Sequence, residues 1–419
     1  MKTLTISKPD KKLKGRISLP TSKSVSNRLL IMQAISGLEF PVEGLSGSDD
    51  TMLLQKLISG IKTVNATKRI IELDTQNAGT VMRFLTAVLS IRPGKWILTG
   101  SERMKQRPVW ALVDALRDLG ADIEYLSRIG FPPLLIKGKP LPGGETAIES
   151  GVSSQFCSAL LMIAPYLPEG MVIHLKGQAV SVPYIDMTLR MMEHFGARLR
   201  KTRHQIRIRP GVYLEKSFTV EADWSAASFW YEAAALADEV DLELIGLKKE
   251  SSQGDSILAK VYHDFGVNTE YTAEGVRLTR SRKKIDGYYF NFSDYPDIAP
   301  PVITTCALLG LRGRFEGLMG LKIKETNRLL ALKNEFEKLG LSLSYDNSQG
   351  MIPVLDLKPS KLKTRIEQPI ETYGDHRMAM TFAPVALKTG SIRITNPDVV
   401  GKSYPDFWTD LESVGFELR

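Results

Sequence analysis

A long-period repeat is the feature of this chain that most constrains its fold. A polar loop, an apolar helix of about a dozen residues, a Gly or Pro break and a short Val-, Ile- or Leu-rich strand recur about six times. The spacing of roughly 55 to 80 residues is too long for a solenoid and is typical of a βαβαββ repeat. We expect a weaker first strand at residues 40–45 and the others at residues 96–100, 172–177, 240–246, 314–318 and 391–395.

The repeat also predicts the domain organisation. Most copies continue into a second helix that ends in Leu-Gly, Phe-Gly or Val-Gly, where Gly suits the helix C-cap. A chain of 419 residues is too long for one compact core. We therefore expect an α/β (α+β) fold with three repeats in each of two domains and the active site in the cleft between them. Counting repeats gives a discontinuous first domain, residues 1–19 with 221–419, and a second domain, residues 20–220.

The composition is that of an ordinary globular protein, with 43% hydrophobic and 24% charged residues. No apolar stretch approaches the roughly 20 residues that cross a bilayer, and the first residues lack an apolar signal region, so we expect a cytoplasmic protein. Two Cys and five scattered His residues predict neither a disulfide nor a metal site. The net charge of +8 is spread along the chain, which favours small acidic substrates over nucleic acid.

Unusual polar loops precede the first helix of each copy. A helix N-terminus already attracts anions through its unpaired N–H groups and its dipole. The first loop, Thr-Ser-Lys-Ser-Val-Ser-Asn-Arg at residues 21–28, adds hydroxyls, Lys23 and Arg28. Ser and Thr also serve as simple helix caps, so this loop alone fits a structural and a functional interpretation equally. The loops lie at residues 21–28, 76–83, 151–155, 221–225, 294–297 and 373–377.

Three further segments suit an anion. Gly79 in Asn-Ala-Gly-Thr would let a ligand approach the backbone N–H groups. Residues 153–155, Ser-Ser-Gln, fit either a helix cap or a ligand contact. Arg103 and Arg107 stand four residues apart, where like charges repel by a few tenths of a kcal/mol, roughly, unless an anion binds them.

Residues 324–328, Lys-Glu-Thr-Asn-Arg, are the most informative of the later motifs. Lys324 and Arg328 share a helix face, and Glu325 can pair with Arg328. An exposed ion pair of this kind is worth only about 0–1 kcal/mol. In a cationic cleft, however, Glu325 is a candidate proton donor and acceptor, and Asp297 is a second carboxylate.

Taken in chain order, the motifs resemble those of the 5-enolpyruvylshikimate-3-phosphate synthase (EPSP synthase) family, the 3-phosphoshikimate 1-carboxyvinyltransferases of the shikimate pathway. The resemblance covers almost the whole chain. The motifs are Ser-Lys-Ser-x-Ser-Asn-Arg, Asn-Ala-Gly-Thr-x-x-Arg, Arg-x-x-x-Arg-Pro, Ser-Ser-Gln, Ser-x-Pro-Tyr, Pro-Asp, Lys-Glu-Thr-x-Arg, Asp-His-Arg and Lys-Ser-Tyr-Pro.

The resemblance implies a two-domain enolpyruvyl transferase fold with pseudo-threefold symmetry in each domain. It implies transfer of the enolpyruvyl group of phosphoenolpyruvate to the 5-hydroxyl of shikimate 3-phosphate by addition and elimination, on the route to chorismate and the aromatic amino acids. It further implies a monomer that uses no metal or cofactor and binds neither nucleic acid nor membrane. Both substrates carry a phosphate and a carboxylate, which matches the cationic loops.

The resemblance also assigns roles to individual residues. Asp297 and Glu325 would carry proton transfer with help from Lys23, and which group moves which proton stays open. The residues around shikimate 3-phosphate would be Lys23, Ser24, Arg28, Ser153, Ser154, Gln155, Ser181, Tyr184, Asp297 and Lys324. The residues around phosphoenolpyruvate would be Lys23, Asn77, Gly79, Arg107, Gln155, Arg328, Arg377 and Lys402.

Four positions depart from the family pattern. Gln76 replaces a Gly that is usual before Asn-Ala-Gly-Thr, Asn327 replaces an Asp, and Gly320 stands where some members have Asn. Phe84 stands where many members have Pro and is expected to shift the helix that carries Gly79, which bears on sensitivity to glyphosate, the family's phosphoenolpyruvate-site inhibitor.

Two other classes of protein share some of these sequence features. A UDP-N-acetylglucosamine enolpyruvyl transferase would share the fold, but it usually has Lys-Asn in the first loop and a reactive Cys near residues 103–107, whereas this chain has Lys-Ser and no Cys there. The second alternative is a non-catalytic anion- or nucleic-acid-binding protein that uses the same basic cleft. Base readout or single-strand binding would need aromatic residues among the cations, and only a few, such as Phe84, Trp110 and Tyr184, lie near a motif.

Overall fold

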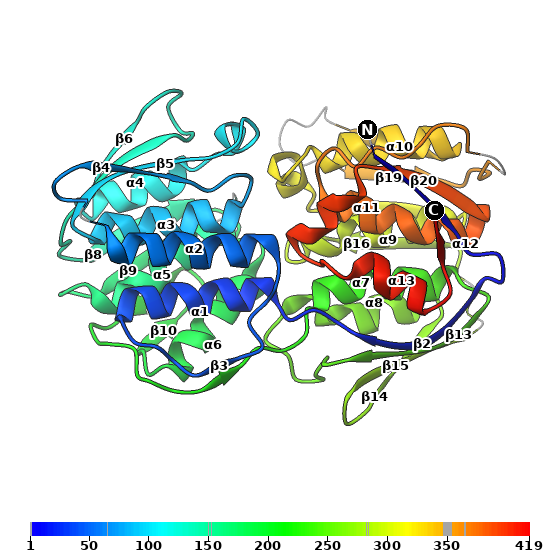
Figure 1. Ribbon diagram of the computed structural model, residues 1–419, viewed down its shortest axis with the longest axis horizontal. Helices are drawn as coiled ribbons and strands as arrows, with labels where there is room; N and C mark the ends of the chain where they lie inside the picture. The colour runs from blue at the N-terminus through cyan, green and yellow to red at the C-terminus, as the bar shows by residue number, and fades with distance from the viewer. Residues whose placement is uncertain are drawn as a thin grey trace. The chain divides into compact units, whose positions relative to one another are not determined.

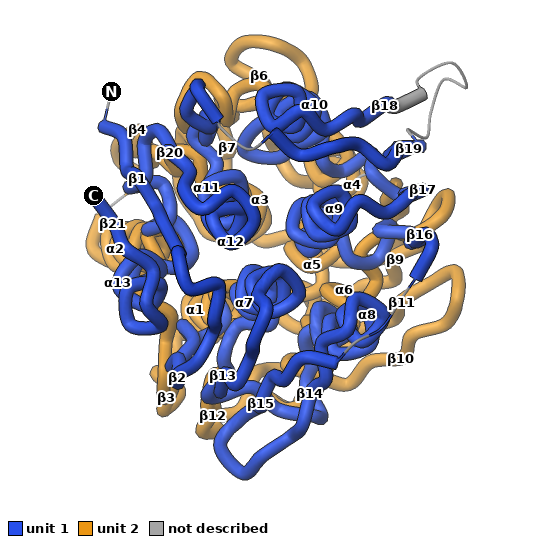
Figure 2. The backbone as a smooth tube through the Cα atoms, turned by 90° about the vertical axis from the view of Figure 1, so that its right-hand side faces the viewer, with its two compact units in different colours: residues 1–22, 221–419 blue, residues 23–220 orange. Residues whose placement is uncertain are grey.

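The computed structural model of the chain describes residues 2–64, 66–149, 151, 153–281, 283, 285–346, 354–363 and 366–419. The chain forms two compact units, residues 1–22 with 221–419 (unit 1) and residues 23–220 (unit 2) (Figure 2). It therefore passes between the units twice, after residues 22 and 220, where repeat counting had placed the crossings after residues 19 and 220.

Four sheets share one strand order, two in each unit. The first two strands of each sheet are parallel, and the last two form an antiparallel hairpin whose second strand joins the parallel pair. In unit 2 the first sheet has the spatial order β4 (Ile70–Asp74), β5 (Gly94–Thr99), β7 (Leu134–Gly138) and β6 (Asp122–Tyr125). The second sheet has the order β8 (Gly144–Glu149), β9 (Met171–Lys176), β11 (Gln205–Ile208) and β10 (Leu199–Lys201). In unit 1 the first sheet has the spatial order β2 (Lys12–Ser18), β13 (Glu239–Ile245), β15 (Gly275–Arg280) and β14 (Val267–Tyr271). The second sheet has the order β16 (Gly287–Asn291), β17 (Arg312–Glu316), β19 (Val354–Lys358) and β18 (Ser342–Asp346).

The first and last copies of the repeat are reduced. The first copy has only β3 (Val42–Glu43) paired in parallel with β12 (Phe218–Thr219). The last copy has β20 (Ser391–Thr395), β1 (Thr3–Ser7) and β21 (Glu417–Leu418), with a parallel bridge from Ile370 to Ile394 in place of a first strand. The first copy, expected to be the weaker one, is indeed reduced to a two-residue strand, whereas the reduction of the last copy was not predicted. Pro41 and Gly44, which flank β3, explain why that strand is short.

Three central helices pack against one another in each unit, namely α1, α3 and α5 in unit 2 and α7, α9 and α11 in unit 1. They are largely buried and form the cores of the units, as residues 226–236 of α7 show. The α-helices of the described residues are labelled in Figure 1. The helices are α1 (Lys23–Ser36), α2 (Asp49–Thr63), α3 (Gly79–Ile91), α4 (Trp110–Asp118), α5 (Ser154–Ile163), α6 (Val182–His194), α7 (Trp224–Leu236), α8 (Leu258–Asp264), α9 (Ala299–Leu308), α10 (Arg328–Leu339), α11 (His376–Phe382), α12 (Ala386–Thr389) and α13 (Phe407–Ser413).

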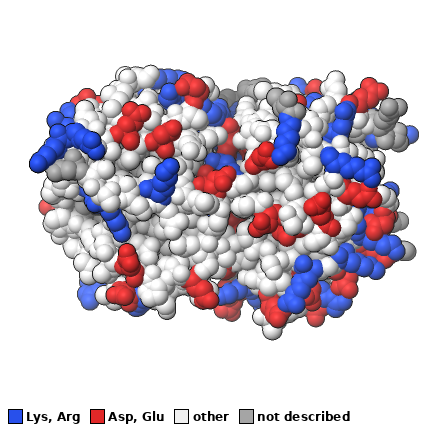
Figure 3. Space-filling view, viewed as in Figure 1, with Lys and Arg blue, Asp and Glu red and all other residues white. Residues whose placement is uncertain are grey.

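This arrangement confirms the predicted α/β fold of repeated sheet units. Because each central helix follows its strand through the same crossover, the polar loops at the helix N-termini gather at one end of each unit. Cys157 and Cys306 are free and buried. Within the described residues no helix has both the length and the apolar character of a membrane span, and no cluster of His, Cys, Asp or Glu is placed to hold a metal ion. On the face in Figure 3, Lys and Arg are interspersed with Asp and Glu.

Candidate active site

Several polar loops do act as helix caps. Ser153 accepts a hydrogen bond from the N–H of Gln155 at 3.3 Å at the start of α5, and Asp375 accepts one from the N–H of Arg377 at 2.9 Å at the start of α11. Asn327 caps α10 by accepting from the N–H of Leu330 at 3.3 Å. Asn and Asp cap helices equally well, so the departure at position 327 leaves this helix start intact.

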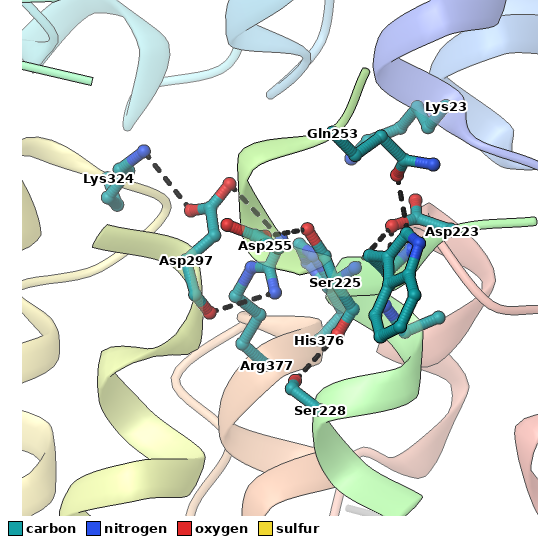
Figure 4. Close-up of polar contacts among 12 residues, drawn as sticks. Lys23, Asp223, Ser225, Ser228, Gln253, Asp255, Asp297, Lys324, His376 and Arg377 are labelled. Atoms are coloured by element: carbon teal, nitrogen blue, oxygen red, sulfur yellow. Dashed lines mark hydrogen bonds and ion pairs between the residues drawn. The ribbon is translucent and has the colours of Figure 1, made fainter. Parts of the chain in front are cut away.

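Asp297 lies at the centre of a charged cluster in unit 1. It occupies the short 3-10 helix Pro296–Ile298, directly before α9, and its side chain is 18% exposed. One carboxylate oxygen is 3.3 Å from Nζ of Lys324, and the other is 3.2 Å from Nη2 of Arg377 (Figure 4). Arg377 also donates to the backbone carbonyl of Asp297 at 3.0 Å. The loops at residues 294–297, 324–328 and 373–377 are thus brought together.

Arg328 joins the carboxylates of this cluster. It is the first residue of α10, is 1% exposed, and donates through Nε and Nη2 to the two carboxylate oxygens of Asp375 at 2.8 and 3.2 Å. Its Nη2 is also 2.9 Å from Oε2 of Glu325, and its Nη1 is 3.5 Å from Oδ1 of Asp297. Arg328 therefore links a structural carboxylate, Asp375, to the two candidate proton-transfer groups.

The cations of the cluster keep Asp297 ionised. Burial by itself would raise the pKa of Asp297, but Arg377, Lys324 and Arg328 outweigh burial and hold that pKa well below its usual range. Burial lowers the pKa of Lys324, although Asp297 opposes this effect. Burial also works against the charge of Arg328, yet Asp375 and Glu325 raise its pKa above the usual value. Asp297 and Arg328 are therefore held in their charged forms in a largely buried setting.

Lys402 belongs to the same unit. It ends the 3-10 helix Pro397–Lys402, which packs against α11, the helix that carries Arg377. The structure thus places Asp297, Lys324, Glu325, Arg328 and Arg377 in one connected cluster and Lys402 on an element that contacts it.

In unit 2, the first polar loop continues straight into α1, which begins at Lys23. Nζ of Lys23 is 3.1 Å from Oδ2 of Asp50 on α2. Both side chains are largely buried, with 16% and 6% exposure. The ion pair therefore fixes the Lys23 side chain at the start of α1.

Arg28 is directed into the protein. It is 2% exposed, and its Nε donates to Oγ1 of Thr188 at 2.7 Å while Nη1 donates to the carbonyl of Ser24 at 2.8 Å. Its Nη2 donates to Oγ of Ser158 at 3.2 Å and to the carbonyl of Tyr184 at 3.3 Å. Burial lowers the pKa of Arg28 to about 10. Arg28 thus ties α1 to α5 and α6 and fixes the backbone of Ser24.

Gly79 is enclosed by two guanidinium groups. A Cβ at this position would lie 2.5 Å from Nη2 of Arg107 and 2.5 Å from Nη1 of Arg83. Arg107 donates to the carbonyl of Asn77 at 3.1 Å, so it is fixed over the start of α3. A side chain other than hydrogen would push these cations away from the helix N-terminus, and this explains the Gly in the motif.

Gln155 connects the second and third polar loops. Its Oε1 accepts from Nη1 of Arg83 at 2.9 Å, and its Nε2 donates to Oγ1 of Thr80 at 3.0 Å. The remaining expected contacts lie at the same helix starts: Ser154 is the first residue of α5, and Ser181 precedes α6 with a left-handed φ of 55°. Tyr184 lies in the first turn of α6. Unit 2 therefore gathers its expected residues around the starts of α1, α3, α5 and α6.

Two carboxylates that hold predicted site residues were not predicted from the sequence: Asp375 holds Arg328, and Asp50 holds Lys23. Arg83, which a sequence motif does include, holds Gln155. Asp375 stands inside a recognised motif, so a rule that a buried Arg requires a carboxylate would have found it. Asp255 was also missed: it is buried in unit 1 beside Ser225, whose hydroxyl donates to it (Figure 4). No sequence motif pointed to Asp255.

Comparisons with known proteins identify the family and the fold. The sequence model of EPSP synthase (3-phosphoshikimate 1-carboxyvinyltransferase) matches residues 7–411. The chain is 46% identical to a 3-phosphoshikimate 1-carboxyvinyltransferase of Bacteroides fragilis and 36% identical to one of Vibrio cholerae, over 97% of the chain in both cases and 97% and 98% of the relatives. The solved structure of EPSP synthase from Acinetobacter baumannii shares the fold, with a TM-score of 0.75 at 21% identity over 100% of both chains. The chain therefore belongs to the EPSP synthase family of transferases.

Proposed function

We propose that the two sets of helix starts together perform the family reaction with the residue roles set out below. The enzyme transfers the enolpyruvyl group of phosphoenolpyruvate to shikimate 3-phosphate, a step of the shikimate pathway towards aromatic amino acids. The observation that carries the residue roles is the cluster in which Asp297 and Glu325 contact Arg328 and Asp297 contacts Lys324 and Arg377. It combines two carboxylates for proton transfer with cations for anionic substrates.

The cluster suggests how Asp297 acquires basicity. In the absence of substrate its low pKa makes Asp297 a weak base. Substrate phosphate and carboxylate groups that bind Arg377, Lys324 and Arg328 compensate the same cations that hold this pKa down. Binding of both anions therefore raises the pKa of Asp297 and prepares it to take the proton of the 5-hydroxyl as that oxygen attacks C2 of phosphoenolpyruvate.

Glu325 is suited to move the proton at C3 of phosphoenolpyruvate. It contacts the guanidinium of Arg328 and is 10% exposed, so water has little access to it. In the addition, Glu325 in its protonated form gives a proton to C3 of phosphoenolpyruvate, and in the elimination its carboxylate takes a proton back from C3, with Lys23 and its partner Asp50 assisting. Phosphate leaves as C3 loses its proton, and the surrounding cations stabilise the charge that develops.

The two substrates are assigned to residues by the resemblance to the family's motifs, because both substrates carry a phosphate and a carboxylate. Phosphoenolpyruvate would take Arg107, Gly79 and Gln155 of unit 2 with Arg328, Arg377 and Lys402 of unit 1. Shikimate 3-phosphate would take the starts of α5 and α6, through Ser153, Ser154, Ser181 and Tyr184, and Lys324. Because four donors of Arg28 already bind the protein, we assign it mainly to fixing Ser24 and α6. The family also supports a monomer in the cytoplasm, testable by sedimentation and cell fractionation.

Phosphate release from phosphoenolpyruvate tests the function. The purified chain is assayed with shikimate 3-phosphate and, separately, with UDP-N-acetylglucosamine. We expect turnover only with the first acceptor. Turnover with the second acceptor alone would assign the chain to the related enolpyruvyl transferase, and binding of both anions without phosphate release would make it a non-catalytic binding protein.

A further inference from the structure

The outer face of the β10–β11 hairpin in unit 2 carries four arginines. Arg200 lies directly opposite Arg207 in the antiparallel register. Arg198 lies opposite Arg209, whose N–H donates to the carbonyl of Arg198 at 2.9 Å. Side chains alternate along a strand, so these four share one face, while Ile206 points to the other face and is buried. All four arginines are exposed.

Such an arrangement is unfavourable without an anion, because like charges opposite each other destabilise a sheet. The corresponding hairpins of other repeats avoid it. In β6–β7, Lys137 pairs with Glu124 at 2.5 Å. In β14–β15, Glu270 lies opposite Arg277, which also pairs with Asp241 at 2.7 Å. Across the described residues, by contrast, no carboxylate forms an ion pair with any of the four arginines of β10–β11.

The same arginines line a hollow of about 620 Å³. Polar side chains of Thr202 and Gln205 complete the wall on the hairpin, and Glu193 of α6 is the one acidic residue among those that line it. Lys201 is not part of this wall, because it pairs with Asp186 of α6. A volume of this size suits a small ligand. The hollow therefore presents four cations and a single carboxylate to whatever enters it.

We propose that this arginine hollow binds a small ligand with two or more phosphate groups. A guanidinium group matches phosphate oxygens in a bidentate manner. Opposed arginines stand about 5.5 Å apart at Cα and successive pairs about 7 Å apart along the strands, so their long side chains reach adjacent phosphates of one molecule. Single-stranded nucleic acid would require aromatic side chains for stacking, and the residues that line the hollow include none.

The proposal is tested by calorimetric titration of the full chain with inorganic tripolyphosphate at about 0.15 M salt. The double variant R200Q/R207Q removes the central pair, and the control R277Q/R314Q removes two exposed arginines that have carboxylate partners in unit 1. We expect one binding component to weaken roughly tenfold or more in R200Q/R207Q and to persist in the control. Any binding at the active site is common to all three proteins. Identical titrations of the three would overturn the proposal.

A local probe separates this hollow from other anion sites. The native residues Cys157 and Cys306 are 1% and 0% exposed, so a dye on T202C reports from the wall of the hollow alone. We expect a saturable change in dye emission with tripolyphosphate that R200Q/R207Q abolishes, while kcat of R200Q/R207Q without the dye stays at the wild-type value. A change that does not saturate, or tighter binding of an oligonucleotide of equal charge, would refute a small-ligand site.

Discussion

The candidate site residues of the two units handle charge differently. In unit 1, Arg328 and Arg377 bind the carboxylates of Asp375 and Asp297. In unit 2, Arg28 and Arg83 donate to hydroxyl, amide and carbonyl oxygens of the protein. Arginines that face carboxylates are partly neutralised, whereas arginines held by neutral oxygens keep their charge. Lys23 of unit 2 is an exception among the unit 2 cations, because it pairs with Asp50. The difference between the arginines fits the proposal that unit 1 supplies the carboxylates for proton transfer and that unit 2 supplies a rigid positive field for substrate anions.

This comparison predicts which kinetic constant each unit controls. Substitutions of the unit 1 carboxylates should lower kcat, because proton transfer occurs only in the transition state. Substitutions that displace the unit 2 cations should act mainly on KM, because those cations bind the anionic groups of the substrates throughout.

The largest effect is expected for E325Q. The amide keeps the size and a hydrogen bond to Arg328 but cannot accept a proton, so kcat should fall roughly 10²- to 10⁴-fold with little change in either KM. Steady-state kinetics measure both constants. E243Q, at an exposed ion pair with Arg16, is the control and should leave both constants unchanged. A loss confined to KM would show that Glu325 binds substrate and moves no proton.

The substitution G79A tests whether the cations of unit 2 bind phosphoenolpyruvate through their positive charge. The added methyl group would overlap Arg107 and Arg83 at 2.5 Å, so these side chains must move away from the start of α3. We expect KM for phosphoenolpyruvate to rise about tenfold, since one displaced charge-assisted contact is worth about 1.5–3 kcal/mol, while KM for shikimate 3-phosphate changes less. The matched control is G60A in α2, where nothing lies within 4 Å of the added Cβ. Equal changes in both KM values would contradict a local effect.

Sequence alone predicted the parts of the fold whose residue pattern recurs at regular spacing along the chain. Gly residues at helix ends and apolar strands at regular spacing gave the repeats, and the α/β fold of repeated sheets is confirmed. The weaker first strand lies within the expected residues 40–45, but its partner could not be predicted, because β3 pairs with β12 from residues about 175 positions away and tertiary packing determines such short strands.

The charge partners were predictable only in part. The expected pair of Glu325 and Arg328 is present at 2.9 Å. Pairing between distant segments, however, leaves no local pattern around the cations Lys23, Arg328 and Arg377. Asp375 reaches Arg328 over 47 residues of chain, and Asp50 reaches Lys23 over 27. The inward direction of Arg28 also depends on Thr188, on another helix. The individual substrate contacts stay predictions.

The pH dependence of stability tests Asp255 in unit 1. Burial and the nearby Asp297 raise the pKa of Asp255 to about 7 from 3.8. Between these values the folded state holds more protons than the unfolded state, so this group makes stability fall as pH rises from about 4 to 7. D255N removes the effect. Relative to wild type, its free energy of unfolding should therefore rise between about pH 5 and pH 8 in urea titrations.

D241N is the control for this measurement. Asp241 is exposed, and hydrogen bonding to Arg277 lowers its pKa, so it is ionised in both states over the same range. The difference between D241N and wild type should be constant from about pH 5 to pH 8. A constant difference for D255N as well would mean that Asp255 is ionised in the folded protein throughout.

The smallest effect concerns the backbone of unit 2 at Gln76, where the family usually has Gly. Its φ is 50°, its N–H donates to Asp74 at 2.7 Å, and its carbonyl accepts from Ser101 at 2.9 Å, so the loop is held in a left-handed conformation. A residue with a side chain loses about 1–2 kcal/mol of stability in this left-handed conformation, and Gly does not. Part of the gain from Gly is lost again, because Gly has more conformational freedom in the unfolded chain. Q76G should therefore raise the free energy of unfolding by roughly 0.5–1 kcal/mol in urea titrations. Q55G, in the middle of α2, should lower it by about as much, and a loss of stability in both variants would show that the loop does not strain Gln76.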